Sequence, residues 1–234
     1  MSLLTLVQSV CRAPGLTVQV PNAVATSGDN TILQLMGIAN QEGKSLARRG
    51  AWQALENEAT FTTVATAIQT ALAANLSYII NDTIWNRTLK TALYGPLSPA
   101  DYQAQLAATS VGPWARYRVR GGRILFLPTP TAGQTCVYEY ITKAWCTDST
   151  GATAKTALSA DSDVSLLDEF IMEMGMVWRW KQGKGLDYAE DFAKYEYLVA
   201  DALGRDGSKP ILDAGGSEYG TFPGVFVTAG SWNL

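Results

Sequence analysis

The sequence contains no histidine, and this absence removes several classes of activity at once. Histidine is the commonest general base in enzymes, completes the usual Ser-His-Asp triad and takes part in most zinc sites. No Gly-x4-Gly-Lys-Ser/Thr phosphate-binding loop is present either. The composition therefore favours a structural or binding protein over an enzyme. We expect no catalytic residue, no cofactor and no metal site.

Charge is also scarce, because Asp, Glu, Lys and Arg make up only 17% of the 234 residues. An average soluble protein has roughly 25% charged residues. The net charge of −3 argues against a surface that holds nucleic acid by neutralising phosphates. With 47% hydrophobic residues, the chain can still bury a sizeable core. Proteins with such a low fraction of charged residues often have large surfaces that contact partners.

A membrane span and an export signal are not indicated. The apolar start at residues 1–11 has no basic residue before it and is too short to cross a bilayer. It is better interpreted as a helix capped by Ser2. Without export, Cys11, Cys136 and Cys146 are expected to be reduced thiols, and their spacing fits no zinc site.

The stretch RYRVRGGRILFLPTP, residues 116–130, predicts a β-hairpin. Gly121 and Gly122 supply the positive φ that a two-residue turn needs, so that Arg116 pairs with Leu127 and Arg120 with Arg123. The strands then have an apolar face and a cationic face. The apolar face carries Tyr117, Val119, Ile124 and Phe126, and the cationic face carries Arg116, Arg118, Arg120 and Arg123 beside Leu125 and Leu127.

A third strand is predicted at residues 135–142, where the side chains again alternate. If its aromatic side, with Tyr138 and Tyr140, joins the apolar face of the hairpin, Glu139 falls among the arginines. The aliphatic stems of Arg116 and Arg118 would then cover the two leucines while their charged ends pair with Glu139.

Helical patterns flank this β region. One helix is expected to begin near Asp29, and a second at Ser98-Pro99-Ala100-Asp101, where serine caps and proline occupies the first position. A helical hairpin is predicted between about 163 and 204, with Asp163 or Ser165 as its first cap, a Gly183-Lys184-Gly185 turn, and Gly204 as its end. The polar stretch 147–160 is the best candidate for a flexible link.

Two sequence patterns are compatible with a catalytic or ligand-binding site as well as with a structural role. Four acids, Asp161, Asp163, Asp168 and Glu169, fit a divalent cation or a glycosidase pair, but they lie where helix N-termini gather acids. The run Trp178-Arg179-Trp180-Lys181 fits single-strand nucleic-acid binding, but Trp178 belongs to an apolar stripe. Capping and packing are the favoured interpretations.

The last thirty residues are rich in glycine yet carry scattered apolar side chains. Such a segment cannot form its own core, so its apolar residues are expected to be buried against another surface. The candidate docking residues are Ile211, Leu212, Phe222, Val225, Phe226, Val227, Trp232 and Leu234.

Four stretches in order carry a resemblance to a known family: IINDTIWNRT, YGPLSPADYQ, YRVRGGRILFLPTPTAG followed by YEYITKAW, and LLDEF followed by WRWKQGKGLDYAEDFAKYE. From about Leu3 to Gly207, the chain resembles the head-to-tail adaptors of tailed bacteriophages, the neck proteins placed below the portal. The resemblance implies a helical core with an inserted β-sheet, a ring of twelve copies matching the portal, a C-terminal arm reaching the portal, and no enzymatic activity.

Together, these observations predict an α+β fold: a helical bundle core with a small inserted antiparallel sheet (116–127 and 135–142) and an extended C-terminal arm. The expected domains are a ring-forming helical core (1–84 and 160–205), a β-containing insertion (85–146) and a portal-docking arm (206–234). The expected interface with a neighbouring subunit or tail ring comprises Arg116, Arg118, Arg120, Arg123 and Glu139.

The expected function is that of a structural virion protein, assembled in the host cytoplasm and placed in the neck. Its expected partners are the portal, a downstream tail or nozzle protein, further copies of itself, and genomic DNA that passes through the lumen without specific binding. No membrane is involved. The alternatives are a virion-associated nucleic-acid-binding module and a tail enzyme that cleaves glycans.

Overall fold

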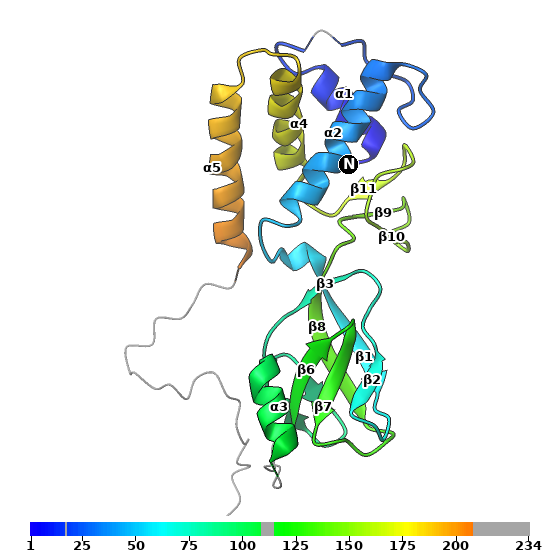
Figure 1. Cartoon of the computed structure of the whole chain (residues 1–234). Coiled ribbons are helices and arrows are strands. Elements are labelled where there is room, and N and C mark those ends of the chain that lie inside the picture. Colours follow the sequence, from blue (N-terminus) through cyan, green and yellow to red (C-terminus); the bar gives the residue numbers. More distant parts are fainter. Residues whose placement is uncertain (17, 109–114, 208–234) are drawn as a thin grey trace, which may run out of the picture.

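The computed structural model describes residues 1–16, 18–108 and 115–207, and it divides into a helical module and a β-sandwich (Figure 1). Of the described residues, 36% are helical and 22% are in strands. The helical module contains four helices and a small sheet, and the sandwich contains the remaining strands and one helix. The chain passes from the first module to the second and back again.

The helices begin where the sequence supplies caps. Ser2, Asp29 and Ser98 each accept a hydrogen bond from a backbone N–H in the first turn of the helix that follows, as predicted. A short 3-10 turn, η1 (Gln53–Leu55), joins the modules. The α-helices are α1 (Leu3–Cys11), α2 (Asn30–Leu46), α3 (Pro99–Ala107), α4 (Glu169–Gly183) and α5 (Ala189–Asp206).

The ends of the helical hairpin differ from the prediction in detail. Asp168, rather than Asp163 or Ser165, caps α4 by accepting from the Ile171 N–H at 3.0 Å. The glycine turn after α4 is confirmed, with Gly185 at φ +70°. Helix α5 continues past the predicted end at Gly204 and ends at Asp206.

The strands form three antiparallel sheets. The first sheet has the order β1-β8-β4-β5, with β3 also paired to β8, the second has the order β2-β7-β6, and the third has the order β10-β9-β11. The strands are β1 (Glu56–Thr62), β2 (Ile68–Ala71), β3 (Leu76–Ile79), β4 (Trp85–Asn86), β5 (Thr91–Ala92), β6 (Arg116–Arg120), β7 (Arg123–Leu127), β8 (Thr135–Thr142), β9 (Cys146–Thr147), β10 (Ala154–Lys155) and β11 (Val164–Ser165).

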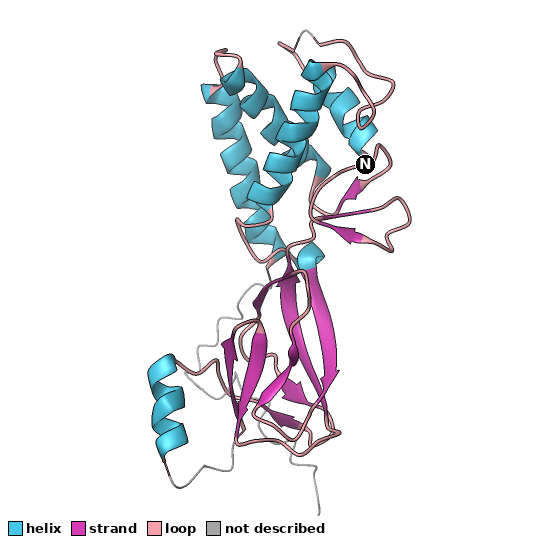
Figure 2. Cartoon of the chain, turned by 45° about the vertical axis from the view of Figure 1, so that its right-hand side comes forward, coloured by secondary structure: helices cyan, strands magenta, loops and turns pink. Residues whose placement is uncertain are grey.

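The first and second sheets face each other and form the β-sandwich (Figure 2). Their shared core contains Tyr117 and Phe126 from the second sheet and Cys136 and Tyr138 from the first. Phe61 of β1 joins the two, with its ring centroid 6.0 Å from that of Phe126 and 6.1 Å from that of Tyr138. Alternating apolar residues on the inner faces therefore supply the core, as sandwich packing requires.

The helical module packs around Trp145, which is fully buried just after β8. Its indole N–H donates to the Thr156 carbonyl at 2.9 Å. Gly43 of α2 lies directly against the indole, and a Cβ at that position would collide with the ring. The glycine thus lets α2 approach the segment that connects the two modules.

The predicted helical-bundle core with one small inserted sheet is wrong. The hairpin and the strand at 135–142 exist with the predicted bounds, but they lie in different sheets. Strands from 56–79 join both sheets, and the predicted flexible link at 147–160 contains β10 and the last residue of β9, which belong to the third sheet. An apolar strand face fits either a side-by-side or a face-to-face arrangement, so the alternation could not distinguish them.

No helix in the described part of the chain is long and apolar enough to cross a bilayer.

Candidate functional site

The arginine hairpin, β6 and β7, has the predicted register. Arg116 pairs with Leu127, Arg118 with Leu125, and Arg120 with Arg123. Gly121 and Gly122 have φ of +59° and +69°, the conformation of a turn that matches the strand twist. The hydrogen bond from the Leu72 N–H to the Gly122 carbonyl places the tip beside the segment between β2 and β3.

The outer face of this hairpin is covered in part by α3. Tyr102 of α3 packs on Leu125 and Leu127, and the Arg118 guanidinium carbon lies 5.5 Å from the centroid of the Tyr102 ring. Arg120 and Arg123 are exposed. Within the described residues, none of the four hairpin arginines makes an ion pair. Their charge is therefore available to a partner.

Glu139 does not lie among these arginines. The aromatic side of β8 does join the apolar face of the hairpin, but from the opposite sheet of the sandwich. The other side of β8, which carries Glu139, consequently faces away from the hairpin. The predicted pairing of Glu139 with Arg116 and Arg118 within one chain is therefore wrong, because sheets stacked face to face turn their outer faces in opposite directions.

Glu139 instead belongs to a glutamate patch on the outer face of the first sheet, which we define as Glu56, Glu58 and Glu139. Glu58 and Glu139 are directly opposed on β1 and β8, an unfavourable position for like charges. Burial, together with the nearby Glu56 and Glu58 carboxylates, raises the pKa of Glu139, while Arg87 acts in the opposite direction. Arg87 pairs with Glu58 at 2.7 Å.

The sequence did contain a signal for this patch. Glu56 and Glu58 are two residues apart, and Ala59 and Phe61 alternate with them, so both acids fall on one face of a strand and the apolar residues on the other. Their partner strand could not be read from the sequence, since β8 is about 80 residues away along the chain.

The four acids considered as a cation or glycosidase site have separate structural roles. Asp161 accepts from the Val24 and Ala25 N–H groups at 3.0 and 2.7 Å. Asp168 caps α4, and Glu169 pairs with the N-terminal amine of Met1. In the described part of the chain, no group of three potential ligands is suited to a metal ion.

Asp163 holds the third sheet to the loop before α4. Its side chain, 1% exposed, accepts from Lys155 Nζ at 2.6 Å and from the Ser159 and Ala160 N–H groups at 2.7 and 2.9 Å. Burial acts to raise the pKa of Asp163, but these hydrogen bonds outweigh it and the pKa is lowered. The carboxylate is therefore kept charged for a structural purpose.

The Trp178-Arg179-Trp180-Lys181 run belongs to the core of the helical module. Trp178 packs against Phe192 at a centroid distance of 5.0 Å, and both tryptophans are buried. Arg179 pairs with the buried Glu42, and Lys181 pairs with Asp191. These aromatic faces and cations are consequently occupied within the chain, and the run does not form a stacking platform for bases.

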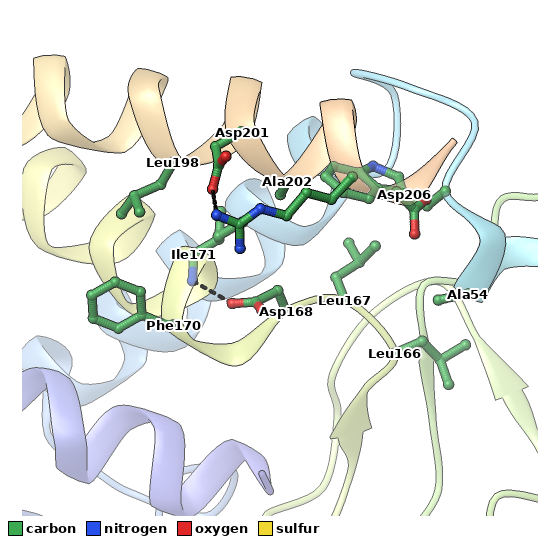
Figure 3. Close-up of a pocket in the computed structure, with 12 residues that line it drawn as sticks. Ala54, Leu166, Leu167, Asp168, Phe170, Ile171, Leu198, Asp201, Ala202 and Asp206 are labelled. Carbon is green, nitrogen blue, oxygen red and sulfur yellow. Dashed lines mark hydrogen bonds and ion pairs between the residues drawn. The ribbon is translucent and has the colours of Figure 1, made fainter. Parts of the chain in front are cut away.

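A groove lies where the chain leaves α5 (Figure 3), and we call it the arm-root groove. Its volume is about 460 Å³. Leu166 and Phe170 on its wall are 38% and 51% exposed. Nothing in the sequence distinguishes Phe170 from the buried apolar residues of α4, so this opening could not be predicted from the sequence. The lining consists of Trp52, Ala54, Leu166, Leu167, Asp168, Phe170, Ile171, Leu198, Asp201, Ala202, Arg205 and Asp206.

The eight candidate docking residues of the C-terminal arm, from Ile211 to Leu234, lie outside the described residues.

Comparison with known families now adds to this geometry. The model of a family described as "SU10 adaptor protein" matches residues 1–211, nearly the whole chain. The chain belongs to this family. The match confirms the resemblance to phage head-to-tail adaptors and identifies the chain as a structural adaptor of a bacteriophage, which implies a position in the neck of the virion. No match was found among the curated proteins.

Proposed function

We propose that this SU10 family adaptor forms a ring of twelve copies that joins the portal to the next tail or nozzle protein, with a central channel through which DNA passes. Family membership supports association with portal and tail proteins. The observation that carries the ring is the distribution of charge on the sandwich. Its two outer faces have opposite character, as a head-to-tail contact between identical subunits requires.

One outer face carries the arginine hairpin, and the other carries the glutamate patch. Arg116, Arg118 and Arg120 lie on the outer side of the second sheet beside Leu125 and Leu127, while Glu58 and Glu139 lie on the outer side of the first. In the proposed ring, the hairpin of one copy contacts the patch of the next. Glu139 thereby remains an interface residue, with its arginine partners on a neighbouring subunit.

Energetic considerations support this contact. The opposed glutamates repel each other in the single chain, and the arginines lack carboxylate partners among the described residues. Contact between copies reduces the repulsion between the glutamates and gives the arginines carboxylate partners. The same contact is repeated around the ring. A face that is arginine-rich also suits carboxylates well, because the guanidinium group is planar and always charged.

The portal contact is assigned to the arm after Gly207. We propose that its apolar residues dock on the portal, one arm from each copy, so that modest individual contacts combine through multivalency. DNA passes through the channel without specific binding, as expected for a protein of net charge −3. The domain division remains part of this proposal: the helical segments build the ring body and the β region supplies charged contacts.

A charge exchange tests the ring contact. The pair Arg120→Glu/Arg123→Glu and the pair Glu56→Lys/Glu139→Lys should each prevent ring formation, observed by negative-stain imaging of the protein alone and mixed with portal. Placing all four changes in one chain should restore rings. An equimolar mixture of the two double variants should also assemble, because alternating copies present opposite charges and a twelve-membered ring has an even number.

Loss of rings in either double variant without rescue in the combined variant would argue against this pairing. Truncation after Arg205 tests the arm separately: the chain should fold and no longer bind portal. Undiminished portal binding by the truncated chain would refute the role of the arm.

A further inference from the structure

The arm-root groove is an apolar surface left open at the end of the described chain. Phe170 of α4 is 51% exposed, whereas the neighbouring Ile171 and Leu167 are buried at 3% and 4%. Figure 3 shows Phe170, Leu198 and Ala202 along its wall, with Leu166 near Ala54. A cavity of about 460 Å³ with such walls favours an apolar occupant.

The rim of the groove is acidic. Asp168, Asp201 and Asp206 line it against one cation, Arg205, which pairs with Asp201 at 2.7 Å. Asp206 also accepts from the Gln53 N–H at 2.7 Å, which ties the end of α5 to η1. An occupant with one positive charge next to its apolar residues therefore matches the rim.

The chain itself supplies such a sequence immediately after the groove. Gly207, the last described residue, has the extended conformation, with φ −75° and ψ 150°. The residues that follow include Lys209, the only lysine or arginine after Arg205, and then Ile211 and Leu212. Its single positive charge and its apolar side chains match the acids and the apolar residues of the groove lining.

Chain length also allows this placement. From Asp206 back to Leu198 along α5 the distance is about 12 Å at ~1.5 Å per helical residue. From Gly207 to Ile211 an extended chain reaches about 13 Å at ~3.3 Å per residue. Ile211 and Leu212 can therefore reach back along α5 as far as Leu198. The family match ends at residue 211, so Lys209 and Ile211 are inside the family's shared length, while Leu212 and the rest of the arm are outside.

We propose that Lys209, Ile211 and Leu212 fold back into the arm-root groove of their own subunit. The first part of the arm is then a fixed root, and the six docking candidates from Phe222 onward are the part that reaches the portal. The direction in which the arm leaves α5 is set by this root. The inference does not depend on the portal, because the root occupies the arm-root groove in the free protein.

Disulfide trapping in the full-length chain tests the root. Ala202→Cys/Leu212→Cys should form an intramolecular disulfide at least ~10-fold faster than Ala202→Cys/Val225→Cys, since docking holds residue 212 at a high effective concentration. Loop length alone, 10 against 23 residues, accounts for only about a threefold difference. Cys11, Cys136 and Cys146 are buried and do not compete.

A second control uses the other side of the same helix. Tyr197 is 72% exposed and is not part of the groove lining, so Tyr197→Cys/Leu212→Cys should cross-link no faster than the Val225 pair. The inference is overturned if the Ala202/Leu212 pair is not faster than loop length explains. It is also overturned if the product is a disulfide between two chains, which would assign the groove to a second copy.

A stability measurement separates this inference from portal docking. Ile211→Ser/Leu212→Ser should lower the thermal midpoint of the free protein, and Val225→Ser/Phe226→Ser should leave it unchanged. In a portal-binding assay, Val225→Ser/Phe226→Ser should cause the larger loss. An unchanged midpoint in Ile211→Ser/Leu212→Ser overturns the root, whereas undiminished portal binding in both variants overturns the docking proposal alone.

Discussion

The helical module contains a buried, paired charge in its core, whereas the glutamate patch and the hairpin arginines of the β-sandwich lie on its outer faces. In the helical module, Glu42 is fully buried and contacts both Arg179 and the hydroxyl of Tyr195. In the sandwich, Glu58 and Arg87 form an exposed pair, and Glu139 faces other glutamates. Charge therefore contributes to the internal structure of one module and is available for contact with partners in the other.

The two modules also differ in the size of their hydrophobic cores. The helical core joins α1, α2, α4 and α5 to Trp145 and Leu158, while the sandwich core is a smaller set between two sheets. A large, well-packed body and a smaller module with charged faces suit a ring adaptor. In the ring that we propose, the body keeps its shape while the faces of the sandwich provide the contacts.

The largest effect should come from Trp145→Ala, which removes a fully buried indole at the junction between the modules. Loss of this packing and of the hydrogen bond to Thr156 should lower the free energy of unfolding by about 3–5 kcal/mol. Chemical denaturation provides the measurement, with Tyr197→Ala as the exposed aromatic control. Equal effects of the two substitutions would contradict the central role of Trp145.

The contrast between buried and exposed charge can be measured with two glutamates. Glu42→Ala leaves Arg179 without its buried partner and should cost about 3 kcal/mol. Glu58→Ala removes an exposed pair with Arg87 and should cost less than about 1 kcal/mol. Both are compared by urea unfolding at neutral pH. A cost for Glu58→Ala as large as that for Glu42→Ala would remove the distinction between the modules.

The hairpin turn should show a smaller, local effect. Gly122→Val places a β-branched residue at φ +69°, where nothing crowds the Cβ but the backbone conformation is strained. The expected cost is about 1–2 kcal/mol. Gly183→Val at the end of α4 is a useful control, because that position has open space and no positive φ. Comparable melting temperatures for the two variants would contradict the strained turn.

The smallest effect concerns the pH dependence of the glutamate patch. The pKa of Glu139 is raised on folding, so the folded chain keeps this proton to a higher pH than the unfolded chain. The free energy of unfolding therefore falls as the pH rises from the ordinary glutamate pKa through the raised one. Glu139→Gln should remove this loss and stabilise the free chain at neutral pH by about 0.5 kcal/mol.

At low pH the difference between Glu139→Gln and the natural chain should disappear, because Glu139 is then protonated in both states. Thermal melts at several pH values provide the measurement. Glu190→Gln is a control on an exposed helix position outside the patch. A constant difference across the pH range would show that the effect does not come from proton binding.

Local sequence rules were sufficient for several of the elements. Ser2, Asp29 and Ser98 cap helices because their side-chain oxygens satisfy free backbone N–H groups nearby. The Gly121-Gly122 turn fixed the entire register of β6 and β7, since the geometry of a two-residue turn leaves one pairing. These interactions involve neighbours within a few residues.

Most of the wrong predictions concern which segments, distant in the sequence, pack against each other. The apolar alternation of β8 was compatible with a place beside the hairpin, and the structure stacks it against the hairpin instead. The polar stretch at 147–160 became part of a sheet because Leu158 is buried against the helices and its N–H is held by Asn40. The exposure of Phe170 likewise depends on the spacing between α5, η1 and α4.

The sequence by itself determined approximately where the helices occur, the caps at Ser2, Asp29 and Ser98, the tight turn, the lack of histidine chemistry, and the ordered motifs that resemble phage adaptors. Only the tertiary structure decided that arginines and Glu139 point in opposite directions and that a groove opens at the root of the arm. The reason is physical: caps and turns depend on adjacent atoms, whereas the direction of a sheet face and the width of a groove depend on segments brought together by packing.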